Sequence, residues 1–438
     1  MTQRKTKAYI RRRRKIRALI RLCVCALLII GIIVAVIVIA GKSCGGQKAE
    51  EVVYKPGPPQ PKVESTATVA ATGDILLHNS VLNGAWNGET YDFSGSFAYA
   101  AGYWATYDYM IANLEVPCGG EESGEFRGYP SFNAPDEIIG ALKNAGVDMF
   151  LTANNHAYDT GEYGLLRTQD VILDEDLDYV GTRLNADDPY VVIKDINGIR
   201  FGFACYTYDT REYPDSWKSI NGIEMSETAV DLINSFTYSD LPSLYASVAS
   251  DLDTMKKADC DVTMFFMHWG DEYMDHPNGY QTEIAQEMCN MGVNVIIGGH
   301  PHVIQEMQVL QSTNGNGNAT VCLYSMGNAI SSQRKEIMDE DGNRGYTEDG
   351  LTISVTYEKL NNGTVRLTDV SVLPTWVDDD GGVYRIVPLD EKINADKWQT
   401  SAISEAKASY NRTMERLGYA YPALRDYLGT APVKEEIE

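Results

Sequence analysis

VTMFFMHWGDEY, residues 262–273, joins an apolar run to a histidine, a glycine and two carboxylates. The run is rich in aromatic and β-branched residues, which is typical of a strand buried on both faces. The same pattern occurs in VDMFLTANNH (Val147–His156) and in VNVIIGGHPH (Val293–His302). Because open α/β sheets place their sites beyond the carboxyl ends of strands, we expect these histidines to lie together at one sheet edge.

Carboxylate and amide side chains follow apolar runs in the same way: Asp74 after Thr66–Thr72, Glu115 after Tyr107–Leu114, and Asn155 after Val147–Thr152. A single histidine after a strand is more often a loop or core residue than a ligand. Four or five strand ends that share the pattern favour a metal site instead. Carboxylate, amide and imidazole donors suit Mn, Fe or Zn, and the absence of thiolates argues against a structural zinc.

The rest of the body alternates helix and strand signals. Helical patterns over Pro135–Ala145, Leu241–Lys257 and Thr282–Met291 each precede one of the apolar runs, which is typical of an α/β sheet with helices packed outside. Asn197-Gly198 and Asn362-Gly363 are signals for hairpins with type I′ turns. The sequence therefore predicts a mixed sheet or two paired sheets rather than a purely parallel sheet.

Charge is distributed unevenly along the 438 residues. The formal net charge is −24, yet residues 1–21 carry ten basic groups and no acidic group. The remainder therefore has 27 basic against 61 acidic residues, a balance of −34. So acidic a body repels nucleic acid, and we expect no nucleic-acid partner.

An apolar stretch without charge, Leu22–Ala40, follows the basic tail. At about 1.5 Å per residue it is close to the ~30 Å thickness of a membrane interior. The flanking positive charge predicts a single-pass anchor in the cell membrane over residues 22–41, with residues 1–21 in the cytoplasm and the main domain extracellular. A cleaved signal peptide is the alternative, although its apolar region is normally only about 7–15 residues long.

Residues 42–65 are rich in Gly, Pro and charge, and predict a flexible linker. We expect one large domain over residues 66–385 and a C-terminal helical tail over 386–438. The tail includes SEAKASYNRTMERLG, which carries helical signals but no recognisable chemistry.

Six short motifs occur in a fixed order along the chain: Gly73-Asp74, Asn113-Leu114-Glu115, Asn154-Asn155-His156, His268-Trp269-Gly270-Asp271-Glu272, Gly298-Gly299-His300-Pro301-His302 and Ser325-Met326-Gly327-Asn328. In this order they resemble the CapA/PgsA family of capsule (poly-γ-glutamate) synthesis proteins. That family is a branch of the calcineurin-like metallophosphoesterase superfamily. The resemblance extends from about Thr66 to Arg385 and is specific for the family, though not for a substrate.

The resemblance implies a four-layered α/β/β/α metallophosphoesterase-like sandwich that holds two divalent transition-metal ions (Mn, Fe or Zn). It assigns seven ligands: Asp74 and His302 to one metal, with His78 as a third candidate; Asn155, His268 and His300 to the second metal; and Glu115 as the bridge between them. His156 would then act as general acid or transition-state stabiliser without binding metal.

The chain departs from the superfamily pattern at three points. Asp-x-His becomes Asp74-x-x-x-His78, which puts ligation by His78 in doubt, and the bridging aspartate becomes Glu115. The carboxylate that normally follows the catalytic histidine is absent, and Asp159 is the candidate replacement. Arg334 is a candidate clamp for an anionic substrate group, with a solvated loop arginine as the alternative.

Two functions of different class remain open from the sequence. The first is an external metal-dependent phosphoesterase-type hydrolase that acts on an envelope substrate. The second is a non-catalytic binding or scaffold component of a capsule polymer synthesis or export complex. Synthase or export subunits and an anionic polymer are the expected partners, although poly-γ-glutamate itself has no phosphate.

Overall fold

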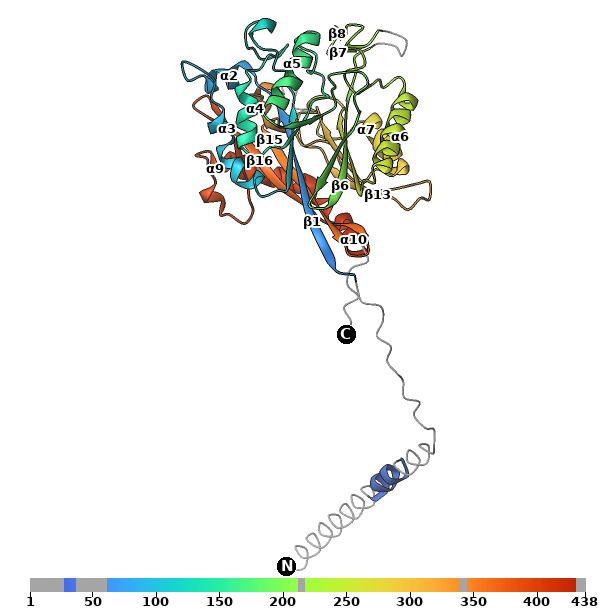
Figure 1. Cartoon of the computed structure of the whole chain (residues 1–438). Helices are drawn as coiled ribbons and strands as arrows, with labels where there is room; N and C mark the ends of the chain where they lie inside the picture. Colours follow the sequence, from blue (N-terminus) through green and yellow to red (C-terminus); the bar gives the residue numbers. More distant parts are fainter. Residues whose placement is uncertain (1–26, 37–60, 212–216, 339–344, 431–438) are drawn as a thin grey trace, which may run out of the picture. The chain divides into compact units, whose positions relative to one another are not determined.

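The computed structural model describes residues 27–36, 61–211, 217–338 and 345–430 (Figure 1). The chain divides into two compact units, Met1–Gln60 and Pro61–Glu438. In the first unit, residues 27–36 are helical and exposed, and the rest of the expected anchor and linker lies outside the described residues. Among the residues described, no helix is long and apolar enough to cross a membrane.

The larger unit contains two sheets, both mixed. The first has the order β17-β16-β15-β1-β2-β3-β4, with β14 paired to β1. Strands β1 to β4 are parallel, whereas β15, β16 and β17 extend the sheet by antiparallel pairing. Its strands are β1 (Val63–Ile75), β2 (Tyr109–Leu114), β3 (Met149–Leu151), β4 (Asp178–Val180), β14 (Asn328–Ile330), β15 (Asp349–Leu360), β16 (Val365–Asp380) and β17 (Val383–Pro388).

The second sheet has the order β12-β13-β11-β10-β6-β5, with β9 paired to β6. Its four central strands are parallel and its two edge strands antiparallel. A separate short hairpin, β7–β8, lies outside both sheets. These strands are β5 (Val192–Ile196), β6 (Ile199–Tyr208), β7 (Ser219–Ile220), β8 (Ile223–Glu224), β9 (Ser235–Phe236), β10 (Val262–His268), β11 (Val295–Gly299), β12 (Met307–Gln311) and β13 (Ala319–Leu323).

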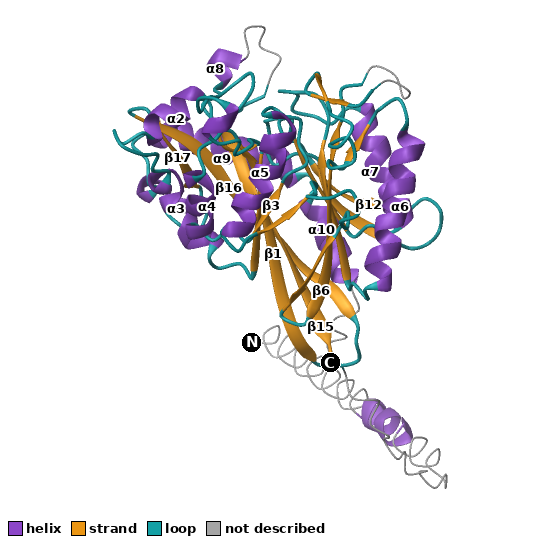
Figure 2. Ribbon diagram, turned by 45° about the horizontal axis from the view of Figure 1, so that its top comes forward, coloured by secondary structure: helices purple, strands orange, loops and turns teal. Residues whose placement is uncertain are grey.

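The helices of this unit lie mainly outside the two sheets (Figure 2). They are α2 (Asn79–Ala85), α3 (Ser94–Trp104), α4 (Glu137–Asn144), α5 (Gly161–Asp174), α6 (Leu241–Lys257), α7 (Gly279–Met291), α8 (Lys335–Met338), α9 (Ile403–Gly418) and α10 (Tyr421–Thr430). Two short 3-10 turns, Glu121–Ser123 and Ala395–Lys397, complete the set of described elements.

Three apolar clusters separate the layers. The inner faces of the two sheets share one core, which includes Val69 of β1 and Phe203 of β6. A second core joins the outer face of the first sheet to α2, α3 and α4, and a third joins the outer face of the second sheet to α6 and α7. The layers therefore follow in the order helices, sheet, sheet, helices, and the predicted α/β class is confirmed.

Most of the predicted elements occur close to their expected bounds. The helix predicted over Leu241–Lys257 matches α6, and the two expected hairpins join β5 to β6 and β15 to β16. Asn197 and Gly198 both have positive φ, as a type I′ turn requires. The prediction of that turn type is wrong at the second hairpin, where a four-residue loop gives positive φ to Gly363 but not to Asn362.

Candidate metal centre

The strand ends place the predicted ligands in one buried group. Asp74 lies near the end of β1, Glu115 directly follows β2, and His268 is the last residue of β10. Parallel pairing sets Asp74 opposite Asn113 and His268 opposite Gly299, so that adjacent strands end at the same level. His300 and His302 follow β11, and all five of these side chains are buried.

Two glycines allow the strands to approach so closely. A Cβ on Gly298 would lie 1.9 Å from the Tyr324 carbonyl oxygen, and a Cβ on Gly299 would lie 2.8 Å from Asp74 Oδ1. Larger residues at either position would therefore push β11 away from its neighbours. The Gly-Gly pair before His300 is a packing requirement of the site.

The ligand atoms form two groups that share Glu115. One contains Asp74, Glu115 and His302, and the other contains Glu115, His268 and His300; in each, the candidate atoms lie within 4.8 Å of one another. Glu115 Oε1 is 3.4 Å from His268 Nε2 and 3.8 Å from His302 Nε2. The geometry thus brings together the residues expected at each metal, with Glu115 between them.

Asn155 lies with the second group. Its Oδ1 is 2.7 Å from His268 Nε2, and its side chain is buried. An amide oxygen so close to the imidazole nitrogen could ligate the same cation. The structure therefore places Asn155 where the sequence predicts a ligand of the second metal.

The chemistry of this group fits a divalent metal. Among the described residues, Glu115 Oε1 and His300 Nδ1 are buried without a hydrogen-bond partner, a situation that is rare in native proteins. Burial and the nearby Asp74 carboxylate raise the pKa of Glu115 well above its usual value. Burial lowers the pKa of His268 to about 3 and that of His300 well below its ordinary range. Neutral imidazoles and a carboxylate without a counter-charge are compatible with divalent cation binding.

The backbone of the loop after β11 is strained. His300 has a φ of 94° and His302 a φ of 59°, in the left-handed region that non-glycine residues seldom adopt. Such conformations cost about 1–3 kcal/mol each and persist only where the surroundings impose them. Here the Asp74 carboxylate accepts a hydrogen bond from the His300 backbone N–H at 3.2 Å and lies 3.2 Å from His302 Nδ1.

Three residues that the sequence analysis did not assign lie at this group. Asn113 Nδ2 donates to Asp74 Oδ1 at 2.7 Å, and Asn328 Oδ1 is 3.1 Å from His302 Nδ1, so both orient candidate ligands. Glu272 is exposed, and its carboxylate groups with His300 and His302. All three residues occur in the six motifs quoted above, so the motifs were the signal that could have found them. The sequence of a motif does not indicate which of its residues faces the site.

His156 pairs with Asp159 beside the candidate ligands. His156 Nδ1 is 2.7 Å from Asp159 Oδ2, which also accepts a hydrogen bond from the Phe132 backbone N–H at 2.7 Å. Asn221, in the turn between β7 and β8, donates to Asp159 Oδ1 at 3.2 Å. The carboxylate three residues beyond His156 thus occupies the place expected for it, and Asn221 is an additional partner that the sequence did not indicate.

His78 and Arg334 lie apart from the grouped ligand atoms. The His78 ring meets the edge of Phe132, and its Nδ1 is 3.5 Å from Ser331 Oγ. Burial lowers the pKa of His78 to about 4, and His78 belongs to none of the candidate groups among the described residues. Arg334 donates to the Val377 carbonyl and lies over the Trp376 ring, 5.6 Å from its centroid. Both engage neighbouring structure instead of completing the group.

Comparisons with known proteins agree on one family. The bacterial capsule synthesis protein family, PGA_cap, matches residues 68–333, more than half of the chain. The capsule biosynthesis protein CapA of Bacillus anthracis is 26% identical over 77% of this chain and 71% of its own length. The PGA biosynthesis protein CapA of Bacillus subtilis (strain 168) is 25% identical over 62% of each chain. Among solved structures, TT1561 of Thermus thermophilus matches at 9% identity over 70% of this chain and 98% of its own, with a TM-score of 0.35, too low to support an argument. The chain belongs to the bacterial capsule synthesis protein family.

Proposed function

From the premise of family membership, we propose that the buried group is a dinuclear metal centre and that the domain is a phosphoesterase-type hydrolase of capsule synthesis. The observation that carries the proposal is Glu115. Its carboxylate is fully buried, one oxygen has no hydrogen-bond partner among the described residues, and two sets of ligand atoms share it. A buried carboxylate of this kind is unfavourable unless a cation compensates it.

The residues divide into two metal sites in this proposal. Asp74 and His302 would hold one ion, Asn155, His268 and His300 would hold the other, and Glu115 belongs to both groups of ligand atoms. Two such ions would supply a hydroxide at neutral pH and would stabilise the charge on phosphoryl oxygens. Asn113 and Asn328 orient Asp74 and His302 through the hydrogen bonds described above.

His156 supplies the proton in the proposed reaction. The Asp159 carboxylate fixes the orientation of the ring through Nδ1, and Nε2 is the nitrogen that would donate to the leaving oxygen. The Phe132 ring packs against the imidazole at a centroid distance of 4.7 Å and limits its rotation. An oriented imidazole of this kind contributes typically about 10²–10⁴-fold to a rate.

We also propose that the domain works outside the cell membrane, held by a single-pass anchor over residues 22–41 and the linker over 42–65. The basic tail followed by an uncharged stretch in the sequence supports this location. A position at the cell surface would give the domain access to envelope phosphoesters, capsule polymer and the subunits that synthesise or export it.

A second candidate function is metal-organised binding without hydrolysis. Arg334, the expected clamp for an anionic group, donates instead to the backbone of β16. In this arrangement the protein itself engages the guanidinium of Arg334, so Arg334 does not serve as the expected clamp. This arrangement favours a binding or scaffold role within the synthesis or export complex.

Hydrolysis of p-nitrophenyl phosphate and of its bis-ester by the purified full chain decides between the two functions. We expect two Mn²⁺ ions per chain by elemental analysis and a rate that depends on them. Two bound ions without release of nitrophenolate from either ester would favour the binding function. An absence of bound metal under metal-replete conditions would contradict both.

A further inference from the structure

A C-terminal helix, α9, reaches the loops of the candidate metal centre through two arginines. Arg412 donates from Nε and Nη2 to both oxygens of Asp349, at 2.9 and 2.8 Å. Arg416, one turn later, donates from Nη2 to Asp275 Oδ2 at 2.5 Å and from Nη1 to the Asp275 carbonyl. The two carboxylates belong to two different segments, 74 residues apart in the sequence.

Asp349 is connected to the candidate ligand His302 through Thr347 and Asn328. It begins β15 directly after Thr347 and Glu348, and the Thr347 carbonyl accepts a hydrogen bond from Asn328 Nδ2 at 2.9 Å. The oxygen of the same Asn328 amide is 3.1 Å from His302 Nδ1. The ion pair between Arg412 and Asp349 therefore fixes the segment at the start of β15. The Thr347 carbonyl in this segment orients the Asn328 side chain.

Asp275 lies in the segment that supports the histidine loop. Two residues earlier, the Tyr273 backbone N–H donates to the carbonyl of Pro301, which lies between the two histidines, at 2.7 Å. Gln305 Nε2 donates to the carbonyls of Met274 and His276 at 2.9 and 3.0 Å. The Arg416 pair thus fixes the segment that holds Pro301 in place and carries Glu272.

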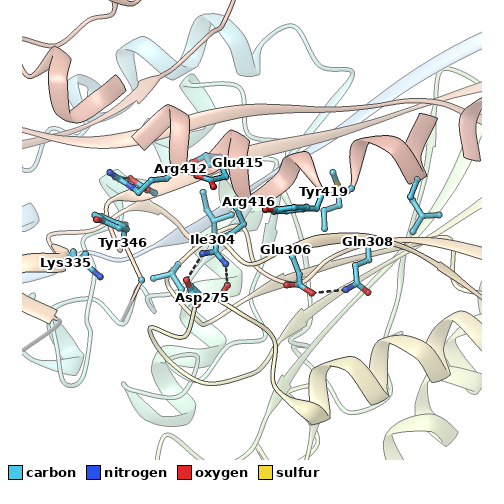
Figure 3. A pocket seen from close by; sticks show the side chains of 18 residues that line it. Asp275, Ile304, Glu306, Gln308, Lys335, Tyr346, Arg412, Glu415, Arg416 and Tyr419 are labelled. Atoms are coloured by element: carbon cyan, nitrogen blue, oxygen red, sulfur yellow. Dashed lines mark hydrogen bonds and ion pairs between the residues drawn. The ribbon is translucent and has the colours of Figure 1, made fainter. Parts of the chain in front are cut away.

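Figure 3 shows both arginines beside a cavity of about 800 Å³ between α9 and the strand β12. Two of the dashed lines join Arg416 to Asp275. Arg412 lies beside Tyr346, whose ring centroid is 3.6 Å from the guanidinium carbon. Because the cavity leaves open space under the helix, the two arginine side chains connect α9 to the loops across it.

We infer that Arg412 and Arg416 are positioning residues that hold the histidine loop in its metal-binding conformation. The inference rests on the proposed metal centre. His300 and His302 have positive φ, so their conformation depends on contacts from outside the loop. α9 fixes Asp275 and Asp349, which belong to the two segments that make or support such contacts, and α9 lies beyond residues 68–333, where the family match ends.

Three variants of the full chain test this inference: Arg412→Gln, Arg416→Gln and, as the matched control, Arg366→Gln. Arg366 pairs with Glu358 at 2.7 Å, with a side-chain exposure of 14%. Glu358 lies nine residues beyond Asp349 on β15, about 30 Å away at ~3.3 Å per residue. The control removes a similar ion pair without touching the metal-site loops.

Mn²⁺ titration and amide hydrogen exchange are the two measurements, both at a temperature at which every variant is folded by circular dichroism. Changes to groups that orient metal ligands typically weaken binding about 10–100-fold, and the arginines act one contact further away. We expect each Gln variant to weaken Mn²⁺ binding about 3–10-fold. Exchange in the metal-free protein should rise over residues 269–278 for Arg416→Gln and over 345–350 for Arg412→Gln.

Arg412→Lys and Arg416→Lys complete the test, because lysine keeps the charge but not the paired donors. We expect partial recovery of Mn²⁺ affinity in both, and wild-type affinity in Arg366→Gln. Wild-type affinity in both Gln variants would overturn the positioning role while leaving the metal centre intact. A wild-type chain that binds no Mn²⁺ would instead overturn the proposed metal centre and this inference with it.

Discussion

Two buried carboxylates, Glu115 at the strand ends and Asp251 between β6 and α6, differ in their hydrogen-bond partners. At the strand ends, Glu115 Oε1 and His300 Nδ1 have none among the described residues. Behind the second sheet, Asp251 Oδ2 accepts a hydrogen bond from the Tyr206 hydroxyl at 2.5 Å. Both carboxylates are buried, but Glu115 Oε1 has no donor in the part of the chain that the structure describes and lies 3.4 Å from His268 Nε2, within a group of candidate metal ligands. Convergent unpaired groups indicate a ligand site, whereas a satisfied pair indicates structure.

The substitution Glu115→Gln is the strongest test of the difference between the ligand site and the structural pair. Because both groups of ligand atoms share Glu115, we expect the loss of both ions and binding of Mn²⁺ that is weaker by about 100-fold or more. The metal-free variant should be no less stable to urea than the metal-free wild type, since a neutral amide replaces a buried carboxylate. Elemental analysis and urea titration measure the two effects.

Glu358→Gln is the matched control for that change, because Glu358 accepts from Arg366 and has no contact with the site. It should retain two ions. Retention of both ions by Glu115→Gln itself would show that the shared carboxylate is not a bridge.

His156→Ala separates chemistry from ligation. His156 pairs with Asp159 and belongs to neither group of ligand atoms, so we expect both ions to remain. If the domain is a hydrolase, the rate at saturating Mn²⁺ should fall about 10²–10⁴-fold. Asp159→Asn should lower the rate less, because it keeps the ring but weakens its orientation.

The comparison variant is His302→Ala, which should lose about one ion. An unchanged rate in His156→Ala, with the rate abolished in His302→Ala, would remove His156 from the reaction and leave the metals as its basis.

How much of this site the sequence could predict depended on where each residue lies. Asp74, Glu115 and His268 end apolar runs, and the end of a run fixes both the position and the direction of the side chain. Asp159 could be proposed because it lies within one turn of His156. Local patterns carry this information, since the strands that carry these residues pair in parallel with their neighbours and end at the same level.

Contacts made by distant segments could not be predicted in the same way. The sequence offered Arg334 as a clamp, but a backbone carbonyl and the Trp376 ring on β16 engage it in the folded chain. The tail after Asp390 showed helical signals and no chemistry, yet Arg412 and Arg416 of α9 reach Asp349 and Asp275. Asn221 reaches Asp159 from a short hairpin 62 residues away. Such contacts depend on how the helix and sheet layers pack against one another. The periodicity of apolar residues along the sequence does not describe that packing.

Asp251→Asn tests the buried carboxylate that pairs with Tyr206. Burial raises the pKa of Asp251 from 3.8 to about 6, in spite of the Tyr206 hydrogen bond that lowers it. The Asp251 carboxylate therefore binds its proton more tightly in the folded state than in the unfolded state. Above pH 6 the carboxylate is charged in both states, and its burial destabilises the fold. This destabilisation disappears as the pH falls towards 4 and the carboxylate becomes protonated. At ~1.4 kcal/mol per pKa unit, the variant should be more stable than wild type at pH 7 by at most about 3 kcal/mol.

Urea unfolding at pH 7 and at pH 4 measures that difference, which should approach zero at the lower pH. Asp253→Asn is the control on the same helix, because Asp253 is exposed and pairs with Lys257 at 2.6 Å. It should change the unfolding free energy by less than about 1 kcal/mol. An equal gain in both variants would trace the effect to helix charge rather than to burial.

The smallest expected effect belongs to His78, a predicted ligand that, among the described residues, belongs to neither group and, unlike Asn155, is not hydrogen-bonded to a member of either. Its ring packs on Phe132 and its Nδ1 approaches Ser331, so its surroundings already account for its burial. His78→Ala should therefore keep two ions and a Mn²⁺ affinity within about two-fold of wild type, as should His276→Ala, whose ring is exposed. Elemental analysis that found one ion in His78→Ala and two in His276→Ala would show that the metal draws His78 into the site. Whether His78 acts as a ligand would then depend on metal binding rather than on the sequence spacing between Asp74 and His78.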